Sequence, residues 1–189
     1  MPNILVMTSE DQRLWEKHLR DQLGDLYDVQ EIRYVESNKT GPTAVRTQTE
    51  PYQGVREAYG DPQQLRKEIK SADIIAIHFE PMTAEVMDEA KKLKLIASTR
   101  GGPVNVDAEA ATARGIMVTH TQGRLAQPVA DHILGLMLSE ARNIARQDAA
   151  LKDGRYFDLE QREKIRVTRH LVSEMEDKTL GIIWFWICW

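Results

Sequence analysis

Residues 73–98 decide the fold, because they hold a complete strand–helix–strand unit. The unit opens on the apolar run Asp73-Ile-Ile-Ala-Ile-His78, which is typical of a strand buried on both faces of a parallel sheet. A helical pattern follows over 83–91, and the next apolar run is Leu95-Ile-Ala-Ser98. We expect the two runs to be parallel neighbours joined by a right-handed crossover.

The same alternation extends this unit in both directions. Further strands are predicted at Ile4–Met7, Val29–Val35 and Ile116–Thr119, and further helices around 14–23, 62–70 and 107–113. Residues 37–62 are rich in Gly, Pro, Thr, Asn and Gln and predict a long surface loop. Five strands with helices between them predict an α/β domain whose parallel sheet has helices on both faces.

Composition excludes several classes of protein. The chain has 189 residues, enough for one domain and part of a second, and a net charge of -4, which gives no reason to expect nucleic acid or an anionic membrane as a partner. Its single cysteine, Cys188, excludes an internal disulfide framework. The N-terminus lacks a basic segment typical of a signal peptide, and no apolar run approaches the ~20 residues of a membrane span. The expected location is the cytoplasm.

The second half predicts one long helix and then a new sheet. Pro128 can begin a helix over 128–146 with an apolar stripe. A strand is predicted over 179–184, where it would open a dinucleotide-binding unit and precede a G-x-G-x-x-G turn. Tryptophan stands at all three glycine positions of that turn, as Trp184, Trp186 and Trp189. A pyrophosphate cradle cannot form there, and the coincidence favours a substitution, a sequence error or a damaged reading frame over an evolved site.

Four blocks of the sequence resemble the D-isomer-specific 2-hydroxyacid dehydrogenases, the family of phosphoglycerate, glycerate and formate dehydrogenases. The first block is Leu93-Lys-Leu-Ile-Ala-Ser-Thr-Arg-Gly-Gly-Pro-Val-Asn-Val-Asp107, which continues as Ala108-Glu-Ala-Ala-Thr-Ala-Arg-Gly-Ile116. The others are Val129-Ala-Asp-His-Ile-Leu-Gly-Leu-Met-Leu138 and Lys178-Thr-Leu-Gly-Ile-Ile183. They keep the family's order and spacing over about 70–183.

The resemblance implies a flavodoxin-like substrate (catalytic) domain over 1–122. Residues 123–189 would be the linking helix and the start of an incomplete NAD-binding Rossmann domain, with helix 128–146 forming a homodimer interface. The family moves a hydride between NAD(H) and C2 of a small 2-hydroxy or 2-keto acid. Its catalytic Arg, Glu and His would lie beyond residue 189, so no catalytic residue is assigned and this chain is expected to be inactive alone.

The resemblance carries a substrate site over to the loop Thr99–Pro103. Arg100, Gly101 and Gly102 are the predicted substrate-binding residues. Two glycines allow a ligand to approach the backbone closely, and free backbone amides suit a carboxylate. Pro103 removes one amide that many relatives have. A tight strand-to-helix turn would explain the glycines equally well, and Arg100 could instead pair with a surface carboxylate.

Two further positions depart from the family pattern in the approach to the linking helix. Leu125 replaces a polar Asn that contacts the substrate or the nicotinamide in many relatives, which puts this contact in doubt. Asp131 replaces a Glu early in the helix and is expected to cap it, because an acid is favourable near a helix N-terminus. The five histidines show no metal-binding spacing, and His78 and His120 are expected to be ordinary hydrogen-bonding residues near the cleft.

Two functions of other classes remain as alternatives. The first is a non-catalytic binding or dimerisation module that associates through helix 128–146. The second is a phosphoacceptor receiver domain, which has a similar topology but needs an Asp at the end of the central strand. His78 stands at that end and Asp73 at the strand's start, so the receiver is the weaker alternative.

Overall fold

The computed structural model describes residues 2–8, 17, 19, 21–22, 31–36, 52–167 and 173–182. The chain divides into two compact units, Met1–Gln122 and Gly123–Trp189. The Trp-rich end of the chain lies outside the described residues, and with it Trp184, Trp186, Cys188 and Trp189. Most of the helix predicted around 14–23 also lies outside them.

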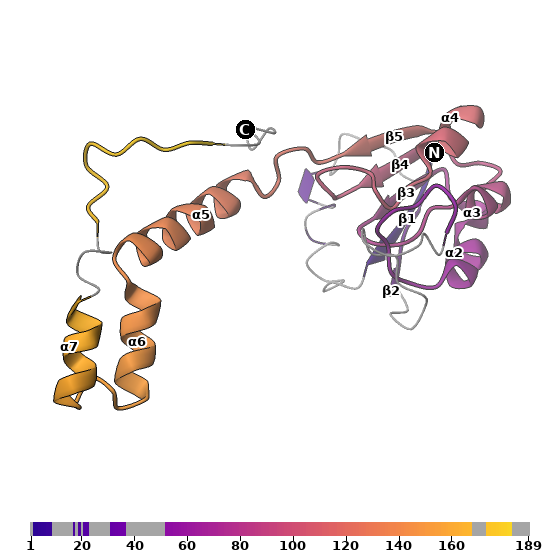
Figure 1. Cartoon of the computed structure of the whole chain (residues 1–189). Helices are drawn as coiled ribbons and strands as arrows, with labels where there is room; N and C mark the ends of the chain where they lie inside the picture. Colours follow the sequence, from indigo (N-terminus) through magenta and orange to yellow (C-terminus); the bar gives the residue numbers. More distant parts are fainter. Residues whose placement is uncertain are drawn as a thin grey trace. The chain divides into compact units, whose positions relative to one another are not determined.

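The first unit is built on a five-stranded parallel sheet of order β2-β1-β3-β4-β5 (Figure 1). The strands are β1 (Asn3–Thr8), β2 (Glu31–Glu36), β3 (Ile74–Ile77), β4 (Leu95–Ser98) and β5 (Met117–His120). Every adjacent pair is parallel, and β3 is central. This is the flavodoxin-like strand order, and it confirms the predicted α/β fold with strand ends displaced by two residues at most.

Apolar side chains cover both faces of the sheet. On one face, Leu5, Ile75 and Ile77 pack with residues of three helices, which are α2 (Pro62–Glu68), α3 (Ala84–Glu89) and α4 (Ala108–Ala113). On the other face, Ile4, Val6 and Ala76 form a smaller cluster with Leu19. The period of two along each strand therefore divides its side chains between two cores, as the apolar runs predict.

The three α-helices α2, α3 and α4 of this unit each begin at a side chain that caps them. The side chains of Asp61, Thr83 and Asp107 accept backbone N–H groups in the first turns of α2, α3 and α4. The 3-10 turn η2 (Ile69–Ser71) prolongs α2. Arg66 of α2 pairs with Glu89 of α3 at 2.9 Å, and this hydrogen bond lowers the pKa of Glu89 below its ordinary value.

The second unit contains α5 (Ala126–Ala141), α6 (Ile144–Lys152) and α7 (Leu159–Val167). The prediction of a single helix over 128–146 is therefore wrong, because the helix is interrupted between α5 and α6. At the break Asn143 is left-handed, with a φ of 59°, and Arg142 donates its N–H to the Leu138 carbonyl at 2.9 Å. Asparagine tolerates this conformation and ends a helix as glycine does.

Two other predictions in this unit fail. Asp131 is the sixth residue of α5, beyond the first turn, and it accepts a hydrogen bond from the Gln127 side chain at 2.9 Å instead of capping the helix. The strand predicted over 179–184 is absent from its described part, 179–182. A strand needs a neighbour to satisfy its backbone, and none of the described strands pairs with this segment.

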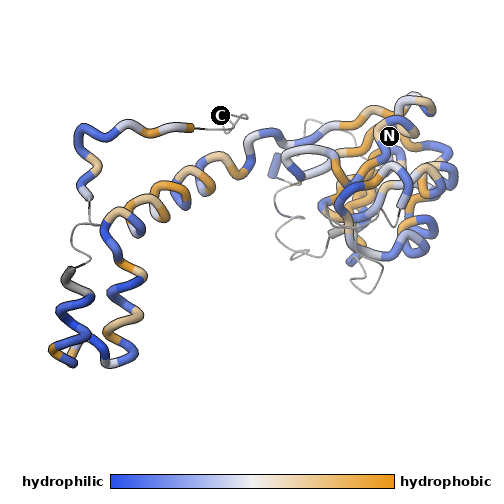
Figure 2. Tube along the Cα trace, in the orientation of Figure 1, coloured by the Kyte–Doolittle hydropathy of each residue, from blue (hydrophilic) through white to orange (hydrophobic). Residues whose placement is uncertain are grey.

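The apolar stripe predicted on the long helix is present on α5 and is open to solvent. Val129, Ile133 and Leu136 are 41%, 50% and 58% exposed. Figure 2 shows α5 as a largely apolar tube, whereas α7 is mostly polar. None of the described helices is long and apolar enough to cross a membrane.

Candidate functional site

The loop after β4 leaves the sheet at the carboxyl ends of its strands, where α/β proteins bind ligands. Thr99 donates its backbone N–H to the Ile77 carbonyl at 3.0 Å, and the Arg100 carbonyl accepts the Thr121 N–H at 2.9 Å. The loop is thus tied to the ends of β3 and β5 just before Gly101 and Gly102.

The fold does not require glycine at either of these two positions. Neither Gly101 nor Gly102 has a left-handed backbone, and a Cβ atom added at either would meet no atom within 4 Å. Within the described part of the chain, neither amide N–H donates a hydrogen bond. The tight-turn explanation of this pair therefore loses its steric basis, and the loop carries two backbone donors without a partner in the described structure.

Arg100 is held between two partners. Its Nη2 lies 2.9 Å from Oε1 of Glu57, and its guanidinium carbon lies 4.5 Å from the centre of the Phe79 ring. The side chain is 15% exposed, and its Nη1 is buried without a hydrogen-bond partner in the described structure. Arg100 thus pairs with a carboxylate, which was one of its two predicted roles, while one of its donors stays unsatisfied.

An aromatic cluster supports this loop from the side of β3. Phe79 stacks on Tyr59 with ring centres 4.3 Å apart, and the His78 ring meets Phe79 edge-on at 4.2 Å. His78 is buried, and its Nδ1 lies 2.5 Å from the Thr99 hydroxyl. The hydrogen bond predicted for His78 is therefore present. His120 is exposed at the end of β5.

Sequence reasoning missed three polar residues that the structure brings to this edge. Glu57 comes from the predicted loop, while Glu80 and Asn105 follow β3 and β4 and are 2% and 0% exposed. The available signal was that Glu80 and Asn105 are each a polar residue within a short apolar stretch, three residues after β3 and seven residues after β4. No group of three His, Cys, Asp or Glu in the described structure could hold a metal.

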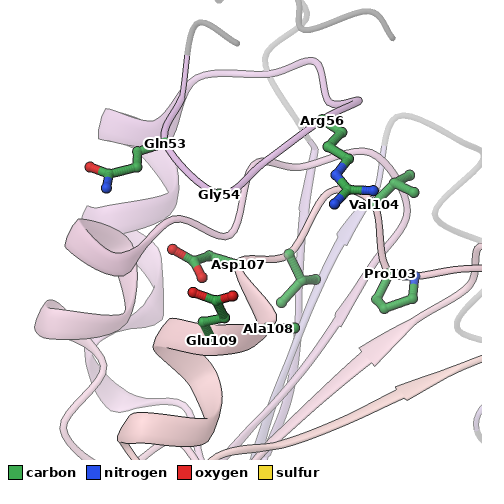
Figure 3. A pocket seen from close by; sticks show the side chains of 9 residues that line it. Gln53, Gly54, Arg56, Pro103, Val104, Asp107, Ala108 and Glu109 are labelled. Atoms are coloured by element: carbon green, nitrogen blue, oxygen red, sulfur yellow. The ribbon is translucent and has the colours of Figure 1, made fainter.

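A pocket of about 520 Å³ lies beside the same loop (Figure 3). Its walls are two segments distant in sequence, 53–56 and 103–109, and Figure 3 shows Asp107 and Glu109 on the side opposite Arg56. Gly54 has a φ of +75°, and a Cβ atom there would lie 2.5 Å from the Asp107 carboxyl group. The pocket therefore depends on the close approach of Gly54 to the first turn of α4.

The fold and this edge define a class: a flavodoxin-like α/β domain with an open, glycine-containing loop at the carboxyl ends of its strands. Within that class, residues 37–183 match the family described as D-isomer specific 2-hydroxyacid dehydrogenase, catalytic domain. The chain belongs to this family, and the resemblance found in its sequence is confirmed. Its central strand ends at Ile77, before His78, so the aspartate of a receiver domain is absent from this position.

Individual relatives agree with this assignment. The chain is 35% identical over 122 residues to D-3-phosphoglycerate dehydrogenase of Methanocaldococcus jannaschii, and the match covers 64% of this chain and 22% of the relative. It is also 35% identical over 123 residues to hydroxypyruvate reductase of Thermotoga maritima, covering 65% and 37%. The chain thus spans about a fifth to two fifths of the length of these relatives.

Solved structures show the same fold. The TT0316 protein from Thermus thermophilus superposes with a TM-score of 0.53 at 29% identity, covering 80% of this chain and 40% of that one. The NAD+-bound 3-phosphoglycerate dehydrogenase of Entamoeba histolytica has a TM-score of 0.52 at 21% identity, covering 75% and 39%. At that identity the second likeness concerns the fold alone.

Proposed function

We propose that this chain supplies the substrate domain of an NAD(H)-dependent D-2-hydroxyacid dehydrogenase, which moves a hydride between NAD and C2 of a small 2-hydroxy or 2-keto acid. The observation that carries the proposal is the pair of free amides at Gly101 and Gly102. Relatives named for phosphoglycerate and hydroxypyruvate support a substrate of this class. In this proposal, residues 1–122 form the substrate domain and residues from 123 onward begin the coenzyme domain.

The two glycine amides would bind the substrate carboxylate. A glycine that neither backbone conformation nor neighbouring atoms require is explained when a ligand must approach the backbone closely. The amides of Gly101 and Gly102 meet this description, and two adjacent N–H donors form an anion site without a side chain.

Arg100 would contribute positive charge to the same loop. Glu57 neutralises part of that charge, but the buried Nη1 has no hydrogen-bond partner in the described structure. An unsatisfied donor on a charged group is costly, and a carboxylate bound at the adjacent loop would reduce that cost.

Alanine at Gly101 or Gly102 is expected to weaken the binding of hydroxypyruvate to the 189-residue chain about tenfold, because a methyl group obstructs access to hydrogen bonds that a charged acceptor makes strong. The chemical shifts of the backbone amides at positions 101 and 102, followed by NMR during titration, measure this affinity. Gly135→Ala is the matched control, since that glycine lies in α5 with open space around it. Unchanged affinity in both loop variants would remove the loop from the site.

The coenzyme of the whole protein is proposed to be NAD(H), which members of the family bind. The 189-residue chain is not expected to bind it, because Trp184, Trp186 and Trp189 occupy the positions where a pyrophosphate-binding turn needs glycine. Calorimetric titration with NAD should give no binding heat, and hydroxypyruvate should not oxidise NADH. Tight binding or enzyme-like turnover by this chain would contradict the proposal.

The second candidate function is a dimerisation module, and the exposed apolar side chains of α5 favour it. Both proposals share one expectation, a homodimer formed through the α5 face within the range 128–146. The break at Asn143 confines that face to the portion that ends at Ala141. Light scattering on the chain tests this, since heterogeneous aggregates instead of a discrete dimer would contradict it.

A further inference from the structure

Three buried polar side chains connect the ends of the two central strands. Glu80 follows β3, Ser98 ends β4, and Asn105 lies beyond the glycine loop, and they are 2%, 3% and 0% exposed. Burying polar groups is unfavourable unless hydrogen bonds replace water. All three are hydrogen-bonded, and the bonds of Asn105 and Ser98 form a path from the backbone carbonyl of Glu80 to the backbone N–H of Arg100.

Glu80 fixes the chain immediately after β3. One of its carboxylate oxygens, Oε2, accepts the backbone N–H of His78 at 2.8 Å and that of Phe79 at 3.0 Å. These two hydrogen bonds tie the turn that carries Phe79 to the Glu80 carboxylate. Because the Phe79 ring lies against the Arg100 guanidinium, this turn forms one support of the loop after β4.

Asn105 joins that turn to the loop. Its Nδ2 donates to the Glu80 carbonyl at 3.1 Å, and its Oδ1 accepts from the Ser98 hydroxyl at 3.3 Å. The Ser98 oxygen in turn accepts the backbone N–H of Arg100 at 3.4 Å. Asn105 therefore uses a donor and an acceptor at once, and the path ends one residue before Gly101.

We propose that Asn105 and Ser98, supported by Glu80, are positioning residues that hold the amides of Gly101 and Gly102 in the conformation that receives a substrate carboxylate. This inference rests on the function proposed above for that loop. None of the three side chains needs to touch the substrate. The bonds at 3.3 and 3.4 Å are long, so the loss of a single one should release the loop without unfolding the sheet.

The test uses the 189-residue chain, labelled with nitrogen-15, and the variants Ser98→Ala and Asn105→Ala. In both variants the order parameters of the Gly101 and Gly102 amides should fall from about 0.85 to below about 0.7, and hydroxypyruvate should bind about fivefold more weakly. Ser98→Thr keeps the hydroxyl and should retain both wild-type values. Thr112→Ala is the control, because it also loses a bonded hydroxyl, at 2.7 Å from the Ala108 carbonyl, but in α4.

Wild-type order parameters and affinity in Ser98→Ala would overturn the proposal, and this variant decides the question even where Asn105→Ala does not fold. A wild-type chain that fails to bind hydroxypyruvate, with glycine amides that still loosen in the variants, would instead overturn the proposed function. That result would support the anchoring of the loop while separating it from carboxylate binding. The ligand-free order parameters therefore distinguish the two failures.

Discussion

Alanine in place of Gly54 is expected to lower the free energy of unfolding of the first unit by about 3 kcal/mol. Two effects add. The left-handed φ of +75° costs a residue with a Cβ atom about 1–2 kcal/mol, and the new methyl group would lie 2.5 Å from Cγ and Oδ2 of Asp107. Urea unfolding of the purified chain measures the change.

Asp107 cannot move aside without a further loss. Its Oδ1 accepts the Ala110 N–H at 2.9 Å and so caps α4, a contribution of about 1 kcal/mol. The same residue lines the pocket of Figure 3 with Gly54. Relief of the contact would therefore distort both the first turn of α4 and one wall of the pocket.

Two other glycines separate the effects of backbone strain and contact. Gly115 has a φ of +68° but open space around it, so Gly115→Ala should cost only the strain of about 1–2 kcal/mol. Gly101→Ala meets neither problem and should change stability by less than about 0.5 kcal/mol. If Gly54→Ala and Gly115→Ala lowered the free energy of unfolding equally, the contact with Asp107 would add nothing to the cost of Gly54→Ala. In an Asp107→Ala background, Gly54→Ala should lose less than in the wild type, because the contacts with Cγ and Oδ2 are gone and only the Cβ atom of residue 107, 3.0 Å away, still crowds the new methyl group.

The fold was predictable from sequence because the strands of the first unit are short apolar runs with clear boundaries. Ile74–Ile77 and Leu95–Ser98 lie in the middle of the sheet, so their hydrophobicity identifies them without any partner. The capping residues Thr83 and Asp107 predict helix starts for the same local reason. Local signals fail at Asn143, since an asparagine inside a helical pattern does not reveal its left-handed backbone.

The candidate site was predictable only in part. Gly101 and Gly102 were found through a family motif, but the partners of Arg100 were not. Glu57 lies 43 positions before Arg100 and belongs to a segment without a periodic pattern, so no spacing rule connects them. Asn105 is similar, because its role depends on Glu80, which precedes it by 25 positions. Contacts of this kind follow from the strand order and not from any single stretch.

Leucine in place of Glu80 is expected to lower the free energy of unfolding by about 3 kcal/mol, although it fills the site with an apolar side chain of similar size. The backbone N–H groups of His78 and Phe79, which Glu80 accepts at 2.8 and 3.0 Å, would lose their acceptor. An unsatisfied buried donor costs about 1–3 kcal/mol, which outweighs the hydrophobic gain. Urea unfolding again measures the loss.

Glutamine is the matched control at this position, because its side-chain oxygen can accept the same two hydrogen bonds without the charge. Glu80→Gln should therefore lose only about 1 kcal/mol, the difference between a charge-assisted and a neutral hydrogen bond. A leucine variant as stable as the wild type would mean that desolvation of the carboxylate cancels its hydrogen bonds, as in some buried ion pairs. Severe loss with leucine and mild loss with glutamine would instead identify Glu80 as the acceptor that closes the turn after the central strand, on which Phe79 and the position of Arg100 depend.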